Sequence, residues 1–184
     1  MKAIEVFAEK GYHETTVDEI ADNLNVAKGT IYYHYKNKKQ LYLALINEGF
    51  ATLKGRVFEI VEGSGNAEEK LKRLIQVQVD FFQEYSNITF IFLREFYGNV
   101  INRHELTAIL NEYLDLIAGI LNEGQENGQF RPLETEVTTF MIFGAVAVST
   151  LNYLHQPAGL TPELFLKNVI EGIFYGIKGV ERQK

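Results

Sequence analysis

The 184-residue sequence contains no cysteine and no tryptophan, and it has only three prolines. A chain without cysteine forms no disulfide framework, no cysteine-ligated zinc site and no thiol nucleophile, and it suits a reducing compartment. The first ten residues include acidic side chains and lack a long apolar segment, so no signal peptide is predicted. We therefore expect a cytoplasmic protein.

Long hydrophobic runs are also missing. The longest unbroken apolar run, from Phe140 to Val148, has nine residues, whereas a membrane span needs roughly 18. We interpret the uncharged stretch around it, residues 137–162, as a buried helix and a loop, and we expect no membrane partner. Apolar residues make up 46% and charged residues 23%, which is the balance of an ordinary globular protein.

Basic residues are in the minority, and the net charge of −6 by itself argues against binding to nucleic acid. The charges are unevenly distributed, however. Residues 1–47 hold six lysines and six acidic residues, so the whole deficit lies in residues 48–184. Four lysines and no acidic residue lie between Asp22 and Glu48. Such a cluster is either a solvated helix face or a phosphate-binding surface, and the residues around it decide between the two.

The first 47 residues have the pattern of three short helices. The first ends at Lys10, before Gly11, and buries Ala3, Ile4, Phe7 and Ala8. The second spans about eight residues from Val17, and Thr16 and Glu19 before and within it have the spacing of a capping box. The third runs from Lys28 to Tyr35 after a turn at residues 25–27, with Ile31 and Tyr35 facing inward.

Two short helices joined by a tight turn form a helix-turn-helix, whose second helix enters the DNA major groove. Lys28 can donate to guanine or phosphate, Thr30 can contact a base edge, and Gly29 permits a close backbone approach. Lys36 and Lys38, at the start of the next helix, are suited to binding phosphate. The remaining exposed positions of the second helix are Tyr32, Tyr33 and His34.

Residues 7–12, 15–21 and 26–38 resemble the DNA-binding region of TetR-type transcriptional regulators. The resemblance implies base-reading roles for Lys28, Gly29, Thr30 and Tyr32, and phosphate contacts for Thr16, Val17, Tyr33, His34 and Lys38. Alternatives stay open: Thr16 as a cap only, Val17 as a backbone donor only, Tyr32 as part of the core, and His34 as a residue packed at the helix end. Ala27 departs from the family by replacing the usual capping serine.

The rest of the chain is predicted to be helical, which makes about nine helices in an all-α fold. The expected helices cover approximately residues 39–62, 67–85, 88–99, 103–127 and 134–155, with a last one opened by Thr161, Pro162 and Glu163. We place a DNA-binding domain at 1–46. The resemblance implies that residues 47–184 form an effector-binding and dimerisation domain.

Seven Phe and Tyr residues fall between Phe81 and Tyr97, where they form either plain core or an effector pocket. Arg94 either orients a ligand or pairs with an acid such as Asp80 or Glu95. Composition favours an apolar, aromatic or cationic effector. Residues 92–95 and 121–124 are similar to the fatty-acid regulators of the family, so an acyl-chain effector is an alternative. The candidate pocket residues are Phe82, Phe92, Arg94, Phe96, Tyr113, Phe140, Phe143 and Asn152.

The last two helices carry small residues that let two backbones approach closely, either within the chain or between two copies. A helix-turn-helix reader needs two-fold symmetry to span half-sites about 34 Å apart, which favours a homodimer on a palindromic double-stranded DNA operator. The resemblance implies a repressor that an effector releases from its operator. The candidate interface residues are Gly144, Ala145, Phe165, Val169, Gly172, Ile173, Gly176 and Ile177.

Enzyme motifs are missing as well. The chain has no dinucleotide-binding, Walker A or nucleophile-elbow motif, and its four histidines are scattered. We therefore expect no enzyme activity, no catalytic residue, no metal and no cofactor. The alternative function is a helical ligand- or partner-binding protein that no longer binds DNA, and the intact Lys28, Thr30, Tyr33 and Lys38 argue against it.

Overall fold

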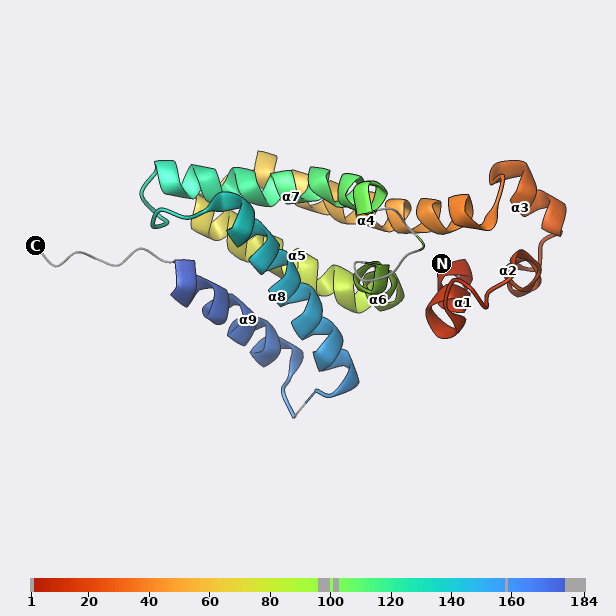
Figure 1. Ribbon diagram of the computed structural model, residues 1–184. Coiled ribbons are helices and arrows are strands. Elements are labelled where there is room, and N and C mark those ends of the chain that lie inside the picture. Colours follow the sequence, from red (N-terminus) through yellow and green to blue (C-terminus); the bar gives the residue numbers. More distant parts are fainter. Residues whose placement is uncertain (1, 96–99, 101–102, 158, 178–184) are drawn as a thin grey trace, which may run out of the picture. The chain divides into compact units, whose positions relative to one another are not determined.

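The computed structural model describes residues 2–95, 100, 103–157 and 159–177, and these residues form nine α-helices (Figure 1). The predicted all-α class and the predicted set of nine helices are confirmed for this part of the chain. Residues 96–99, which the sequence assigns to the end of the sixth helix, lie outside the described residues. The helices are α1 (Lys2–Lys10), α2 (Val17–Leu24), α3 (Lys28–His34), α4 (Lys38–Glu62), α5 (Ala67–Glu84), α6 (Ser86–Glu95), α7 (Arg103–Glu126), α8 (Thr135–His155) and α9 (Pro162–Ile177).

The chain divides into two compact units. Unit 1 consists of residues 1–51 and 85–109, and unit 2 consists of residues 52–84 and 110–184. The single boundary after residue 46 that the sequence suggests therefore does not describe the structural grouping, because α6 and the first turns of α7 fall with the N-terminal helices. A functional division near that residue stays a prediction.

Unit 1 is built around the apolar face of α1. Phe7 is fully buried, and its ring lies 4.8 Å from that of Tyr42 on α4. Helices α2 and α6 both contact α1. Phe50 of α4 and Phe92 of α6 complete the core, with ring centres 4.4 Å apart. Gly11 has a φ of +85°, a left-handed conformation that ends α1 as its position predicts.

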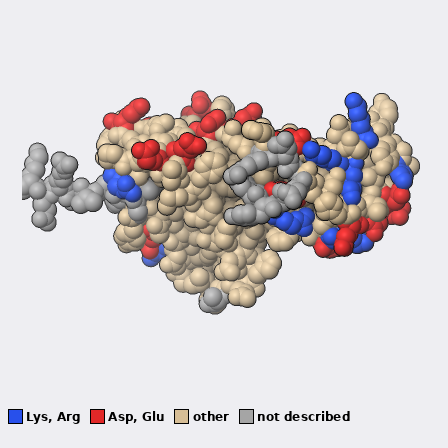
Figure 2. Space-filling view, viewed as in Figure 1, with Lys and Arg blue, Asp and Glu red and all other residues tan. Residues whose placement is uncertain are grey.

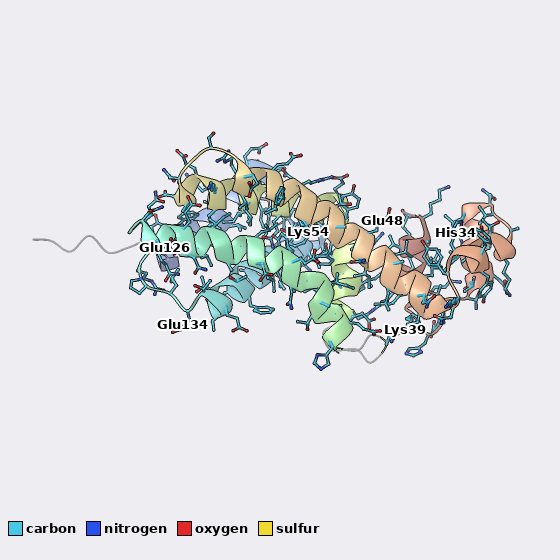
Figure 3. All side chains as sticks on the ribbon, turned by 90° about the horizontal axis from the view of Figure 1, so that it is seen from above. His34, Lys39, Glu48, Lys54, Glu126 and Glu134 are labelled. Carbon is cyan, nitrogen blue, oxygen red and sulfur yellow. The ribbon has the colours of Figure 1, made fainter. Side chains whose placement is uncertain are left out.

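Unit 2 has its core between α5, α8 and α9. The buried face of α5 carries Leu71, Leu74 and Ile75 at the spacing of an amphipathic helix. On the surface of the unit, Lys54 lies in the second half of α4, where Figure 3 labels it. It forms an ion pair with Glu112 of α7.

Helix α8 is the described helix that is long and apolar enough, by length and composition, to cross a membrane. One face of it is buried against α5, through residues such as Ile142 and Val146. Another face exposes Val137, Met141 and Val148, and α9 lies beside α8 (Figure 1). The space-filling view shows a broad uncharged surface over α8 and α9 (Figure 2). Exposed apolar patches of this kind are typical of interaction surfaces.

Candidate nucleic-acid interface and ligand site

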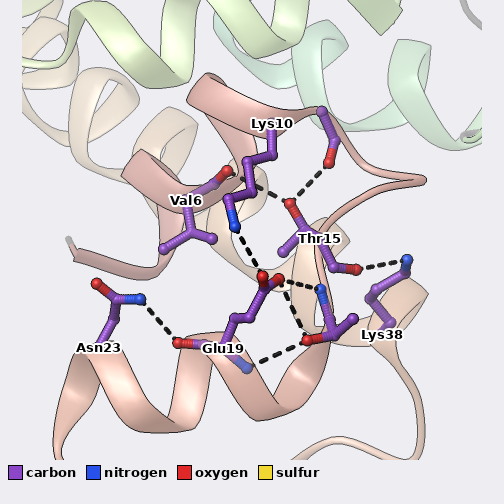
Figure 4. A network of polar contacts seen from close by, with 8 residues as sticks. Val6, Lys10, Thr15, Glu19, Asn23 and Lys38 are labelled. Carbon is purple, nitrogen blue, oxygen red and sulfur yellow. Dashed lines mark hydrogen bonds and ion pairs between the residues drawn. The ribbon is translucent and has the colours of Figure 1, made fainter.

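The N-terminus of α2 is held by the predicted capping box (Figure 4). The Glu19 N–H donates to Thr16 Oγ1 at 3.2 Å, and the Thr16 N–H donates to Glu19 Oε2 at 3.0 Å. Lys10 of α1 donates to Glu19 Oε1 at 2.7 Å. These hydrogen bonds, with that of Lys10 the largest cause, lower the pKa of Glu19 to about 2. Thr16 is thus a cap in this structure, and its side chain is exposed at the N-terminus of α2.

The turn between α2 and α3 has the conformation that its residues favour. Asn25 is left-handed, with a φ of 54°, and its N–H donates to the carbonyls of Ala21 and Asp22. Ala27 precedes α3 without any side-chain hydrogen bond, as expected where an alanine replaces a capping serine. The helix that follows buries Ile31 and no other residue.

The remaining residues of α3 form one exposed face. Tyr33 is 86% exposed, and Tyr32 is 43% exposed, so Tyr32 is not a core residue. His34, labelled in Figure 3, is exposed too, although its ring lies edge-on to that of Tyr33 at 5.1 Å. In Figure 2, lysine and arginine side chains lie over the N-terminal helices, beside a group of acidic side chains. An exposed face of aromatic rings, hydroxyls and cations has the chemistry of a nucleic-acid interface.

Gly29 and Lys28 both leave room for a partner. A Cβ atom on Gly29 would meet nothing within 4 Å, so packing inside the chain does not require glycine there. The Lys28 ammonium lies 2.7 Å from Asp18 Oδ1, and this hydrogen-bonded contact raises the pKa of Lys28. Both side chains are more than half exposed, and such surface pairs are weak. A phosphate or base can therefore replace Asp18 at small cost.

Lys38 is engaged inside the unit. Its Nζ donates to the backbone oxygens of Tyr12 at 2.7 Å and Thr15 at 2.8 Å, and to that of His13 at 3.3 Å. It also lies 4.4 Å from the centre of the Tyr12 ring. Lys38 thus holds the α1–α2 turn against α4, a role that the sequence does not predict.

Two other predicted phosphate contacts differ in accessibility. The Val17 side chain is buried, so only its backbone N–H can reach a phosphate. The Lys36 side chain is exposed. The structure thus brings the α2 N-terminus, the exposed face of α3 and Lys36 to the surface of unit 1.

The predicted pocket residues are divided between the units. Phe82, Tyr113 and Phe143 lie together in the core of unit 2, where the Phe143 ring is 5.9 Å from that of Phe82 and 6.0 Å from that of Tyr113. Phe92 lies in the core of unit 1 against Phe50. Among the others, Phe140 and Asn152 are exposed, and Phe96 lies outside the described residues.

Arg94 binds neither of the acids suggested from sequence directly. Its Nη2 donates to the Phe7 carbonyl at 3.3 Å and to the Tyr42 hydroxyl at 3.5 Å. Tyr42 in turn donates to Glu95 Oε1 at 2.8 Å, so the tyrosine connects the two charges. Burial raises the pKa of Tyr42, which keeps the phenol protonated.

Two polar residues of the unit 2 core were missed from sequence. Gln78 is fully buried on α5 and Thr139 is 3% exposed on α8. The signal was present for Gln78, because it continues the buried spacing of Leu71, Leu74 and Ile75, where a polar residue is unusual. No similar signal marks Thr139, since threonine is common on either face of a helix.

The predicted interface residues surround a groove between α8 and α9. The groove has a volume of about 630 Å³ and is lined in part by Ala145, Phe165, Val169, Gly172 and Ile173. Phe165 is buried at its edge, stacked on Tyr153 at 4.3 Å. Gly144 lies on α8 beside the groove. Gly176 and Ile177 end α9, and their surroundings lie outside what the structure describes.

Comparison with known proteins agrees with this arrangement. The family profile of bacterial regulatory proteins of the tetR family matches residues 2–45, and that of a tetracyclin repressor-like C-terminal domain matches residues 64–153. The fatty acid metabolism regulator protein of Bacillus subtilis is 33% identical over 95% of this chain and 91% of its own.

Two solved structures have similar folds. The fatty acid degradation regulator FadR of Bacillus halodurans is 26% identical, covers 96% of both chains and has a TM-score of 0.83. FadR of Bacillus subtilis, in complex with stearoyl-CoA, is 28% identical, with 96% of both chains covered and a TM-score of 0.82. Together with the exposed helix-turn-helix, these findings show that the chain is a ligand-responsive, DNA-binding transcriptional regulator of the TetR family.

Proposed function

We propose that two copies of the chain bind a palindromic DNA operator in the cytoplasm and leave it when a small, largely apolar molecule binds unit 2. The exposed face of α3 is the observation that supports operator binding. Tyr33 is almost wholly exposed, and no neighbour within the described chain explains the glycine at position 29.

Base reading is assigned to the exposed residues Lys28, Gly29, Thr30 and Tyr32 of α3. Thr16, the Val17 N–H, Tyr33, His34 and Lys36 would contact phosphates on either side. Lys38 is assigned to this surface through its support of the α1–α2 turn. Its ammonium already has three backbone acceptors, so a direct phosphate contact would have to displace one of them.

The α8–α9 surface is proposed as the dimer interface. Its groove is apolar, and the exposed Met141 and Val148 of α8 extend the same surface. A four-helix contact with the same surface of a second copy would bury these side chains, as the resemblance to the family implies. Such an interface also provides the two-fold symmetry that a palindromic operator requires.

The effector is proposed to be an acyl-chain compound that enters the core of unit 2 around Phe82, Tyr113 and Phe143. The similarity to fatty acid regulators, one of them in complex with stearoyl-CoA, supports this class. The two recognition helices of the dimer can have a spacing that fits the operator or one that does not. The effector releases the operator if it binds the second conformation more tightly than the first.

An operator-selection experiment tests the DNA-binding half. Random duplex DNA is selected on the purified protein, and the enriched sequence is tested by gel shift with Thr30→Ala and Tyr33→Ala. We expect a palindrome, a changed sequence preference for Thr30→Ala and weaker binding for Tyr33→Ala. Tyr175→Ala, at an equally exposed tyrosine of unit 2, serves as the control and should bind normally. Enrichment of no sequence would favour the alternative, a helical ligand-binding protein without an operator.

A further inference from the structure

Lys28, the only lysine of α3, has a carboxylate partner on the preceding helix. Its ammonium lies 2.7 Å from Oδ1 and 2.8 Å from Oδ2 of Asp18, so both oxygens of the carboxylate share it. Asp18 is ten residues earlier in the chain, in the first turn of α2. The helix-turn-helix therefore joins a cation of the proposed base-reading helix to an acid of the helix before it.

The pair lies within the proposed DNA-binding surface. The side chains of Lys28 and Asp18 are 53% and 60% exposed, and the Lys28 ammonium lies 5.9 Å from the centre of the Tyr32 ring. Thr16 and Val17, both proposed phosphate contacts, directly precede Asp18. A carboxylate at such a position repels the phosphates of any DNA. Its presence there is explained if it controls what Lys28 binds.

The chemistry of the pair favours one kind of second acceptor. A lysine ammonium has three N–H donors, and the two Asp18 oxygens use at most two of them. A guanine in the major groove offers the uncharged acceptors N7 and O6, which can take the remaining donor while the pair stays intact. A phosphate would place a second negative charge beside the carboxylate and must displace it. That exchange of one anion for another brings no gain in neutralised charge.

The strength of the pair sets the size of the effect. The hydrogen bond to Asp18 is the main cause that raises the pKa of Lys28, so the ammonium stays charged at neutral pH. A pair this exposed is weak, and its loss changes an affinity by only about three-fold. Such a factor still matters to a regulator, because sites without the operator sequence far outnumber operators.

We infer that Asp18 is a specificity-determining residue that holds the Lys28 ammonium for an uncharged base acceptor and disfavours a phosphate contact. The inference rests on the proposed function, in which α3 reads the operator. Complexes with other DNA depend on phosphate contacts, so Lys28 adds nothing to their affinity. On the operator, Lys28 donates to a guanine while Asp18 accepts from the same ammonium. Asp18 is thus a positioning residue, since it acts on the DNA through Lys28.

Asp18→Asn tests this inference in the full-length protein. Affinities are measured by fluorescence anisotropy at several salt concentrations, for the selected operator and for a scrambled duplex of the same length. We expect the scrambled duplex to bind about three-fold more tightly, with a salt slope steeper by about 0.9, because Lys28 then contacts one more phosphate. Operator affinity should change by less than about two-fold. An unchanged ratio of the two affinities, or an unchanged salt slope, overturns the inference.

Two controls separate the pair from the general effect of charge. Asp22→Asn removes the same charge from an exposed position one turn further along α2, and it should change both affinities by the same factor. In a Lys28→Met background, Asp18→Asn should leave the ratio of affinities as it is in Lys28→Met alone. An equal fall in the ratio for Asp22→Asn, or a further fall in the Lys28→Met background, would show that Asp18 acts by repulsion and not through Lys28.

The same measurements separate this inference from the proposed function. If the wild-type protein selects no sequence and binds all duplexes equally, the proposed function is refuted, and the inference fails with it. If the wild type prefers its operator and Asp18→Asn retains the same preference, the inference alone is refuted. Melting temperatures of each variant, recorded in parallel, confirm that the folded protein is compared in every case.

Discussion

The Lys38 ammonium lies 2.7 Å from the backbone oxygen of Tyr12, 26 residues earlier in the chain, and 4.4 Å from the centre of the Tyr12 ring. Figure 4 shows that the same ammonium also reaches the Thr15 carbonyl beside the α2 capping box. Lys38 matches a phosphate-binding position of the family, but in this structure its ammonium stabilises the helix-turn-helix. It fixes the start of α4 to the turn that precedes α2.

Replacing Lys38 should therefore lower the stability of the folded protein, even in the absence of DNA. Lys38→Met removes charge-assisted hydrogen bonds to three carbonyls and should lower the free energy of unfolding by about 2 kcal/mol. Lys36→Met, at an exposed lysine, should change it by less than about 0.5 kcal/mol. Urea unfolding of both variants measures the difference. Equal stability would mean that Lys38 acts only through the DNA.

Gly29→Ala should separate folding from DNA binding. Alanine is the better helix former by up to about 1 kcal/mol, and its Cβ meets nothing within the described chain, so the free protein should become slightly more stable. Operator affinity should fall, because the new methyl group would stand where the DNA backbone or a base approaches. Melting curves and gel shifts on the same samples show both effects. A variant that binds the operator as well as the wild type would remove Gly29 from the interface.

The stability of the α1–α2 pair should depend on acid pH. The pKa of Glu19 is lowered to about 2 in the folded protein from its ordinary value of 4.5, so its contribution is complete above pH 4.5. The contribution is lost as the pH falls from about 4.5 to 2, since the carboxylate must then be protonated. Urea midpoints of the wild type and of Glu19→Gln should converge over this range. Glu62→Gln, at an exposed carboxylate, provides the comparison, and parallel curves for wild type and Glu19→Gln would contradict the assignment.

A charge placed in the α8–α9 groove should prevent dimerisation. Val169→Asp would bury a carboxylate in the proposed interface, so the variant should sediment as a monomer and lose most of its operator affinity. Phe58→Asp introduces the same charge at an exposed aromatic position of α4 that does not line the groove, and it should remain dimeric. Analytical ultracentrifugation distinguishes the two. A dimeric Val169→Asp protein would locate the interface elsewhere.

Local features of the molecule were predictable from the sequence. The capping box depends on Thr16 and Glu19, which are three residues apart, and the end of α1 depends on the conformational freedom of Gly11. The approximate positions of the helices follow from apolar spacings of three and four residues, because one helix face must be buried, although α6 begins at Ser86, two residues before the expected start. The exposed face of α3 was also predictable, since Ile31 is the one apolar residue placed to be buried among its seven residues.

Non-local features were not predictable from the sequence. Phe82 and Phe92 are both apolar residues of one aromatic-rich stretch, and only the folded chain places them in different units. Arg94 bonds to a carbonyl 87 residues away, and Gln78 to one 65 residues away. The sequence by itself determined the helices and the DNA-reading surface, because both depend on neighbours within one or two turns. The tertiary structure decided the role of Lys38 and the burial of Gln78 and Thr139 in unit 2, because hydrogen bonds and burial depend on which helices pack together.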